Sequence, residues 1–165
     1  MNISNVFKNE RLKKNITVYN IFNLILILLI FFLDRFSKIK IIKSQSNLNN
    51  LFINDYLNFD LVWNTGIGFG LFNLEANIFY HLVSLFIFLV ILILLIFAFR
   101  GNVYEKFLYS MIIGGALGNL YDRITYFAVP DFIDFHIDNY HWFTFNIADI
   151  FISLGVILLL LKEIS

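Results

Sequence analysis

Residues 114–149 read GGALGNLYDRITYFAVPDFIDFHIDNYHWFTFNIAD and join the end of one apolar run to the start of the next. Amide and charged side chains gather where the first run ends, and Asn146 and Asp149 open the second run. Asp131 lies between the two runs, directly after the single proline of the chain. Ionisable groups are costly beside long apolar segments, so their presence here indicates a functional site.

The composition indicates a helical membrane protein with a single domain over residues 1–165. The chain is 59% hydrophobic and 15% charged, and its mean hydropathy of +0.77 is too high for an ordinary soluble domain. A formal net charge of zero offers no basic surface to nucleic acid, which excludes that class of partner. The lack of cysteine excludes disulfides, thiolate catalysis and cysteine metal sites.

The apolar runs predict an all-α integral membrane protein with four transmembrane helices. The first loop is rich in β-forming aromatic residues at 52–63, followed by turn-forming residues, so we predict a small β-cradle inserted between helices 1 and 2. The expected spans are about 18–34, 77–99, 105–121 and 146–161, and the long loops are 35–76 and 122–145.

Four spans place both termini on one side of the membrane and both long loops on the other. The distribution of Lys and Arg favours cytoplasmic termini and an extracytoplasmic cradle. Spans one and three then end, and spans two and four begin, at the same face. The polar motifs expected to converge there are Asp34 with Lys38, the turn from Asn64 to Phe69, Asn119 with Arg123, Asp131, and Asn146 with Asp149.

Asp131 and Asp149 are the candidates for catalysis. The chain has no cysteine and no serine with a credible base, whereas these two aspartates recur at the expected depth. Two neighbouring carboxyl groups do not both ionise easily, so they share a proton and one pKa rises. The ionised member can activate water while the protonated member polarises a carbonyl, which is aspartic-type peptide hydrolysis. Asp122 is the weaker choice, because Arg123 beside it is an expected ion-pair partner.

Other functions have less support in the sequence. His136 and His141, with Asp134 and Asp138, suggest a metal site, but their spacing matches no firm ligand pattern. We therefore interpret that segment as a solvated loop and predict neither a metal nor another cofactor. A proton-coupled transporter would need a carboxylate near the middle of a span. A non-enzymatic assembly protein that docks through the first loop would not depend on Asp131.

Five motifs occur in order along the chain. They are DRFSK at 34–38, NTG at 64–66 followed by Phe69, GGALGNLYDR at 114–123, VPDF at 129–132 and FNIAD at 145–149. Each motif is weak alone, but the ordered set resembles the lipoprotein signal peptidase (signal peptidase II) family over about residues 18–161. Ile67 and Gly68 depart from the two alanines that the family often has at those positions.

That resemblance implies an aspartic peptidase of the bacterial inner (cytoplasmic) membrane, with its site at the extracytoplasmic face. Its substrate would be a prolipoprotein that carries diacylglycerol on the lipobox cysteine, cut on the amino side of that cysteine. Membrane lipids and globomycin-type inhibitors would be further partners. By similarity Asp131 and Asp149 are catalytic. The residues implied to bind substrate are Asn64, Asn119, Arg123 and Asn146. The residues implied to support the site are Asp34, Lys38, Gly66, Gly118 and Asp122.

Overall fold

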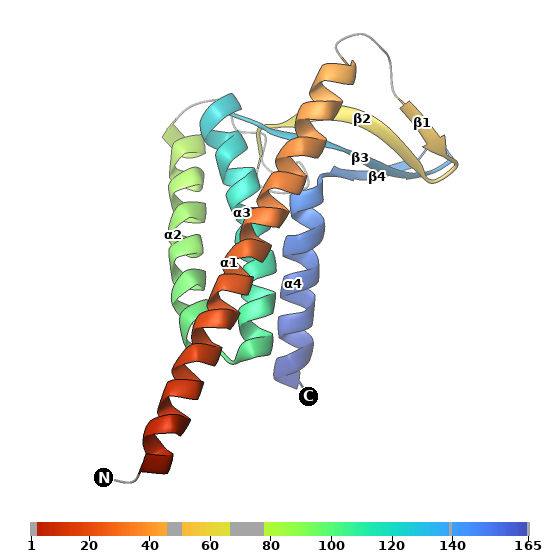
Figure 1. The fold of residues 1–165 in the computed structure, drawn as a ribbon. Helices are drawn as coiled ribbons and strands as arrows, with labels where there is room; N and C mark the ends of the chain where they lie inside the picture. Colours follow the sequence, from red (N-terminus) through yellow and green to blue (C-terminus); the bar gives the residue numbers. More distant parts are fainter. Residues whose placement is uncertain (1–2, 46–50, 67–77, 139, 165) are drawn as a thin grey trace.

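The computed structural model describes residues 3–45, 51–66, 78–138 and 140–164. Helices and strands alternate in groups along this part of the chain (Figure 1). In order they are α1 Ile3–Gln45, β1 Leu51–Asn54, β2 Leu57–Asn64, α2 Ile78–Arg100, α3 Val103–Tyr126, β3 Val129–Ile137, β4 Tyr140–Phe145 and α4 Ile147–Ile164.

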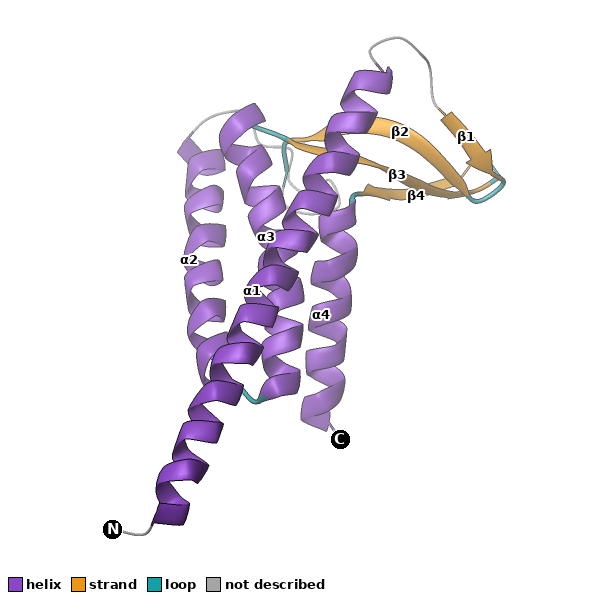
Figure 2. Cartoon of the chain, viewed as in Figure 1, coloured by secondary structure: helices purple, strands orange, loops and turns teal. Residues whose placement is uncertain are grey.

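The helices form a bundle, and the sheet extends sideways from one end of it (Figure 2). Within the bundle α3 packs against α1, α2 and α4. The sheet is antiparallel with the strand order β1-β2-β3-β4. The two ends of the chain lie at the end of the bundle opposite the sheet (Figure 1). The strands therefore lie at the end of the bundle where the alternating direction of the four helices predicts that the polar motifs meet.

Glycines of α3 allow its neighbours to approach closely, as small residues at helix contacts do. A Cβ on Gly115 would lie 2.6 Å from the carbonyl oxygen of Ala148 in α4. A Cβ on Gly118 would lie 2.5 Å from the Asp34 carboxylate on α1. Both distances are shorter than Cβ contacts in real proteins, so the α4 backbone and the Asp34 carboxylate can hold these positions only because α3 has glycine there.

The first helix is longer than the hydropathy predicts. Residues 35–45, which we expected in the first loop, are the last turns of α1. Lys38 lies one helical turn after Asp34 and forms an ion pair with it at 2.7 Å. The charges that end the apolar run are thus satisfied within the helix and with its neighbours, so they do not end the helix.

The β-cradle is not confined to the segment between α1 and α2. β1 and β2 come from that segment as predicted, but β3 and β4 come from residues 122–145, which we interpreted only as a polar loop. β2 and β3 pair from Leu57 opposite Phe135 to Asn64 opposite Val129. A two-stranded hairpin is marginally stable alone. The second loop therefore completes a sheet that the first loop could only begin.

In the described part of the chain, one helix is long and apolar enough to cross a membrane, judged by length and composition. It covers Tyr80–Arg100 in α2, with a mean hydropathy of 3.4 and 6% of its apolar window buried. α3 and α4 carry charged residues in their first and last turns. This criterion does not confirm the four predicted spans.

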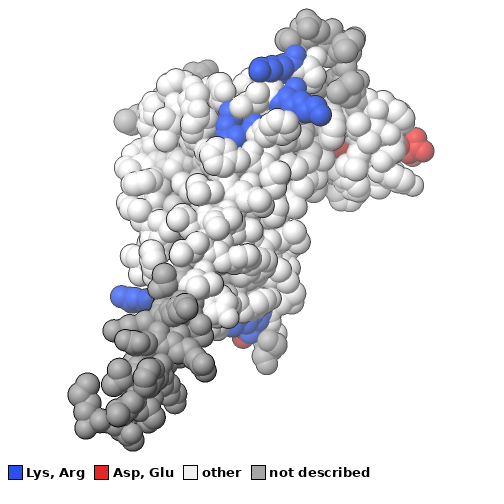
Figure 3. Space-filling view, in the orientation of Figure 1, with Lys and Arg blue, Asp and Glu red and all other residues white. Residues whose placement is uncertain are grey.

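The surface of the bundle is nevertheless apolar over a wide area. Figure 3 shows Lys and Arg side chains toward the two ends of the helical body, with an uncharged surface between them on that face. Large side chains such as Phe32, Phe86 and Leu160 are exposed there or on the other faces of the helices. An apolar surface of this extent is typical of contact with lipid or with another protein.

Gly115→Ala is expected to destabilise the fold, because the added methyl group meets the backbone of α4, which cannot rotate away. We expect a cost toward the upper end of the about 1–3 kcal/mol typical of overpacking. That cost exceeds the about 1 kcal/mol by which alanine is favoured over glycine in a helix. The thermal unfolding midpoint of the purified chain measures the difference.

The matched control is Val156→Ile, which also adds one carbon but at an exposed position of α4. Its unfolding midpoint should stay close to that of the original chain. A Gly115→Ala midpoint equal to that of the control would contradict the proposed role of glycine in the α3–α4 contact.

Candidate active site

Asp131 and Asp149 lie where the sheet meets the bundle. Asp131 is near the start of β3 and is 2% exposed, and Asp149 is half-buried in the first turn of α4. Asn146 contacts both carboxylates. Its Nδ2 donates to Asp131 Oδ1 at 2.6 Å, and its backbone N–H donates to Asp149 Oδ2 at 3.1 Å. One residue therefore bridges the two acids.

Asn146 also determines where α4 begins. The backbone N–H of Asp149 donates to Asn146 Oδ1 at 3.0 Å, and this bond together with the return bond to the Asp149 carboxylate forms a capping box. Asn146 is therefore the N-cap of α4. The negative side chain of Asp149 is also favoured by the positive end of the helix dipole.

Two more asparagines donate to the pair. Asn64, at the end of β2, donates from Nδ2 to Asp131 Oδ2 at 2.9 Å. Asn119 of α3 donates from Nδ2 to Asp149 Oδ1 at 2.9 Å. Each of the four carboxylate oxygens of the pair thus accepts a hydrogen bond from the protein. The asparagines predicted to line the site do converge there, and they orient both acids.

Burial raises the pKa of Asp131, and the nearby Asp149 carboxylate raises it further, to about 7. Hydrogen bonds from Asn64 and Asn146 act in the opposite direction, because they stabilise the ionised form and lower this pKa. Desolvation is the larger effect. Near neutral pH the Asp131 carboxyl group can therefore hold a proton that an exposed aspartate would lose.

A group of buried charges supports the site from below. The Lys38 ammonium, which is 0% exposed, donates to Asp34 Oδ2 and Asp122 Oδ2 at 2.7 Å each and to Asn119 Oδ1 at 2.8 Å. Asp34 Oδ1 in turn accepts from the backbone N–H of Ala148 at 3.0 Å. Lys38 and Asp34 thereby join α1 to α3 and to the start of α4.

The predicted ion pair between Asp122 and Arg123 is wrong. Asp122 pairs with Arg35 and Lys38 of α1 rather than with its neighbour Arg123. Adjacent residues on a helix point in different directions, so Asp122 and Arg123 serve different surroundings. Arg35 is a residue that the sequence reasoning missed as a site support. Its guanidinium also lies 4.6 Å from the ring centre of Tyr121.

Gly66 links the end of β2 to α3. Its N–H donates to Asn64 Oδ1 at 2.9 Å, and its carbonyl accepts from Arg123 Nη2. The buried Nη1 of Arg123 has no hydrogen-bond partner among the described residues. The rest of this predicted turn, including Ile67, Gly68 and Phe69, lies outside the described residues.

The segment that carries the histidines differs from the prediction. Asp134 and His136 are 4% and 6% exposed, so the solvated-loop interpretation is wrong for both of them. Together with His141 they form a cluster on the β3–β4 hairpin whose potential ligand atoms all lie within 4.8 Å of one another. The bonds around the Asp131–Asp149 pair do not include any of these three residues.

Comparison with known proteins shows the family of the chain. The family model described as "Signal peptidase (SPase) II" matches residues 26–165. A lipoprotein signal peptidase of Pelagibacter ubique (strain HTCC1062) is 42% identical, over 86% of this chain and 87% of the relative. One of Thermodesulfovibrio yellowstonii is 39% identical, over 84% of this chain and 92% of the relative.

Solved structures give the same result for the fold. A bacterial membrane enzyme structure determined by the in meso method superposes with a TM-score of 0.72 at 27% identity, over 87% of this chain and 89% of the other. A second structure of the same description gives a TM-score of 0.70 at 25% identity. The resemblance carried by the five motifs is confirmed, and the chain belongs to the signal peptidase II family.

Proposed function

We propose that the chain is a membrane aspartic endopeptidase that removes the signal peptide from diacylglyceryl-modified bacterial prolipoproteins. The cut falls on the amino side of the lipidated cysteine. Family membership supports the substrate class. The observation that carries the mechanism is the pair Asp131 and Asp149, bridged by Asn146, in which burial and the second carboxylate raise the pKa of Asp131.

The proposed reaction uses one proton shared between the two acids. The ionised carboxylate takes a proton from water as the water oxygen attacks the scissile carbonyl. The protonated carboxyl group donates to the carbonyl oxygen and stabilises the charge that develops on it. As the C–N bond breaks, the leaving nitrogen takes a proton from one acid and a hydroxyl of the tetrahedral intermediate returns a proton to the other, so the pair again holds one proton. The titration belongs to the pair as a whole.

The surrounding residues divide into two roles in this proposal. Asn64, Asn119 and Asn146 line the cleavage site and hold the carboxylates in position through their amides. Arg123 contacts the substrate backbone, because its buried Nη1 lacks a partner among the described residues and suits a peptide carbonyl. No cofactor takes part in this mechanism.

The location follows from the surface and the connectivity. We propose that the four helices cross the bacterial inner membrane, with cytoplasmic termini and the site at the extracytoplasmic face. The exposed apolar surface of α2 and the uncharged band in Figure 3 support contact with lipid. A signal peptide and a diacylglyceryl group are both held by the bilayer, so a site at its edge meets a substrate already confined there. Globomycin-type inhibitors would compete at this site.

The rival transporter function has weaker support. Asp149 lies in the first turn of α4 and Asp131 lies in a strand, so the pair is not within the middle of a helix. Proton-coupled transporters place such groups near the midplane. A docking function would not depend on Asp131, so substitution of the two acids tests it.

Asp131→Asn and Asp149→Asn are each expected to reduce the cleavage rate by at least about 10²–10⁴-fold, the range typical of a positioned acid or base. The assay follows release of the signal peptide from a purified, diacylglyceryl-modified prolipoprotein. Asp55→Asn is the matched control, because it makes the same chemical change at an exposed turn. It should cleave at the original rate.

Asp122→Asn tests the choice of pair. It is expected to lower the unfolding midpoint through loss of its bonds to Arg35 and Lys38, while the folded fraction still cleaves.

If the original chain leaves the lipidated precursor uncut, the proposed peptidase activity is refuted. Full cleavage by folded Asp131→Asn would refute the aspartic mechanism and favour a docking role.

The pH profile of cleavage is expected to fall above about pH 7, where the pair loses its shared proton. Asn64→Ala should move this alkaline limb to higher pH, because the Asn64 hydrogen bond lowers the pKa of Asp131. Asp55→Asn should leave the limb unchanged. An alkaline limb that stays in place in Asn64→Ala would contradict the assignment of the limb to this pair.

The raised pKa of Asp131 also makes the stability of the folded state depend on pH. The folded state holds the Asp131 proton up to about pH 7, whereas the unfolded chain loses it near its ordinary pKa of 3.8. The contribution of Asp131 to stability is therefore fully present below pH 3.8 and is lost as the pH rises toward 7.

A further inference from the structure

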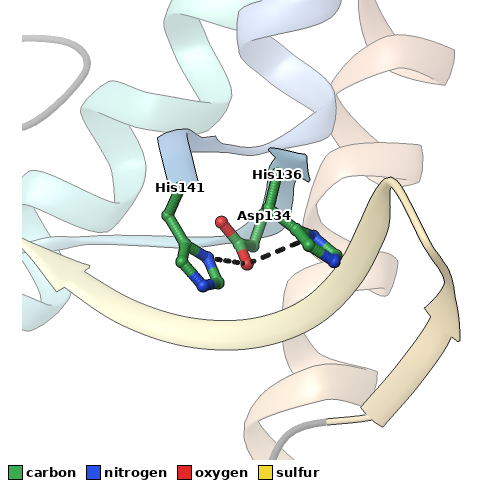
Figure 4. A group of neighbouring side chains, drawn as sticks. All are labelled: Asp134, His136 and His141. Atoms are coloured by element: carbon green, nitrogen blue, oxygen red, sulfur yellow. Dashed lines mark hydrogen bonds and ion pairs between the residues drawn. The ribbon is translucent and has the colours of Figure 1, made fainter. Parts of the chain in front are cut away.

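Asp134, His136 and His141 form a compact cluster on the β3–β4 hairpin, separate from the proposed catalytic pair. Asp134 and His136 are two residues apart on β3 and so share a face of the sheet. His141 lies on β4, directly opposite His136. Figure 4 shows the two imidazole rings on either side of the Asp134 carboxylate, each with a nitrogen turned toward it.

The distances fit a shared binding point. Asp134 Oδ2 lies 2.6 Å from His141 Nδ1 and 3.8 Å from His136 Nδ1. The first of these is a hydrogen bond, and the second is too long to be one. The two imidazole rings stack at 5.2 Å between centres with 20° between their planes, so they form a narrow pair beside the carboxylate.

The buried nitrogen of His136 lacks a partner. His136 is more than nine-tenths buried, and its Nδ1 has no hydrogen-bond partner in the part of the chain that the structure describes. Buried polar atoms are almost always satisfied, so such an atom calls for a bound group. His136 Nδ1 is directed at the Asp134 carboxylate, which is itself an acceptor when ionised.

A second unsatisfied atom lies on the next strand. Asn58 of β2 pairs directly with Asp134 in the sheet, and its buried Oδ1 also has no partner among the described residues. Opposed residues on neighbouring strands lie on the same face. A carboxylate, an unprotonated imidazole nitrogen and an amide oxygen all offer electron pairs. What they share is an affinity for a cation.

We propose that Asp134, His136 and His141 bind a divalent first-row transition metal, of which Zn²⁺ suits the donors best. Imidazole nitrogen with carboxylate oxygen is a common zinc ligand set, whereas Ca²⁺ and Mg²⁺ prefer oxygen alone. The ligand atoms are His136 Nδ1, His141 Nδ1 and Asp134 Oδ2. Water or Asn58 Oδ1 completes the coordination.

The required adjustment is small. Tetrahedral ligands at about 2.0–2.1 Å from zinc lie roughly 3.3 Å from one another. The present separations of 2.6 and 3.8 Å fall on either side of that value, so each changes by less than 1 Å. The His141 side chain, which is 57% exposed, can move away from the carboxylate, and a small rotation of the His136 ring shortens the other separation.

The metal would act as a structural clip. It joins β3 to β4 on the hairpin whose first strand carries Asp131. It takes no part in the proposed hydrolysis, and its binding can be measured without substrate. The failure of one proposal is therefore distinguishable from the failure of the other.

The test is titration of the full chain, purified without a polyhistidine tag and stripped of metal, with Zn²⁺ by calorimetry and with Co²⁺ by absorption. We expect one ion per chain, a tetrahedral Co²⁺ spectrum and a Zn²⁺-dependent rise in the unfolding midpoint. Asp134→Asn and His141→Ala should each weaken binding by at least about 10–100-fold, more than loss of a group that merely orients a ligand.

His81→Ala is the matched control. His81 is the one histidine of the chain outside the cluster, and it lies on α2. It should bind as the original chain does, and so should Asp131→Asn, which lacks only the proposed catalytic acid. Binding by His141→Ala and Asp134→Asn at the original affinity would overturn the proposal. So would the absence of one-to-one binding, which would leave an ordered water or a hydrogen-bonded Asp–His pair at this position.

Discussion

The position of the candidate site depends on one buried ammonium group. Lys38 is enclosed by Asp34, Asp122 and Asn119, so its charge is fully compensated in a place that water does not reach. Removing one partner of such a group typically costs about 3–5 kcal/mol, since the remaining charge is left buried. Because Asn119 also donates to Asp149, the geometry of this acid is tied to the charge of Lys38 through a single amide.

Much of the site could be predicted from the sequence, because its determinants are local. The cap at Asn146 is a pattern of four consecutive residues, 146–149, and the close approach at Gly118 follows from small residues at helical spacing. The alternating direction of the four helices is enough to bring the ends of distant segments to one end of the bundle. The convergence of Asn64, Asn119 and Asn146 on the two acids agrees with that argument.

The features that could not be predicted depend on pairing between distant segments. Hydropathy ends a span at the first charge, but Asp34 and Arg35 remain helical because their partners are supplied by α3. Hydropathy fails in the same way for β3, because its polar residues predict a solvated loop. Asp134 and His136 are buried in a sheet in which Asn58 of β2 lies opposite Asp134 and His141 of β4 lies opposite His136.

The contacts that build the site span most of the chain, with consequences for biogenesis. The Asn64–Asp131 hydrogen bond joins residues 67 positions apart, and the Asp34–Ala148 bond joins residues 114 positions apart. Contacts at such separations form late and slow folding. Until α4 has folded onto the bundle, Asp34 lacks the backbone N–H of Ala148 and Asp131 lacks the side-chain amide of Asn146. Asp149 is itself part of α4, so the Asp131–Asp149 pair forms only when this helix is in place.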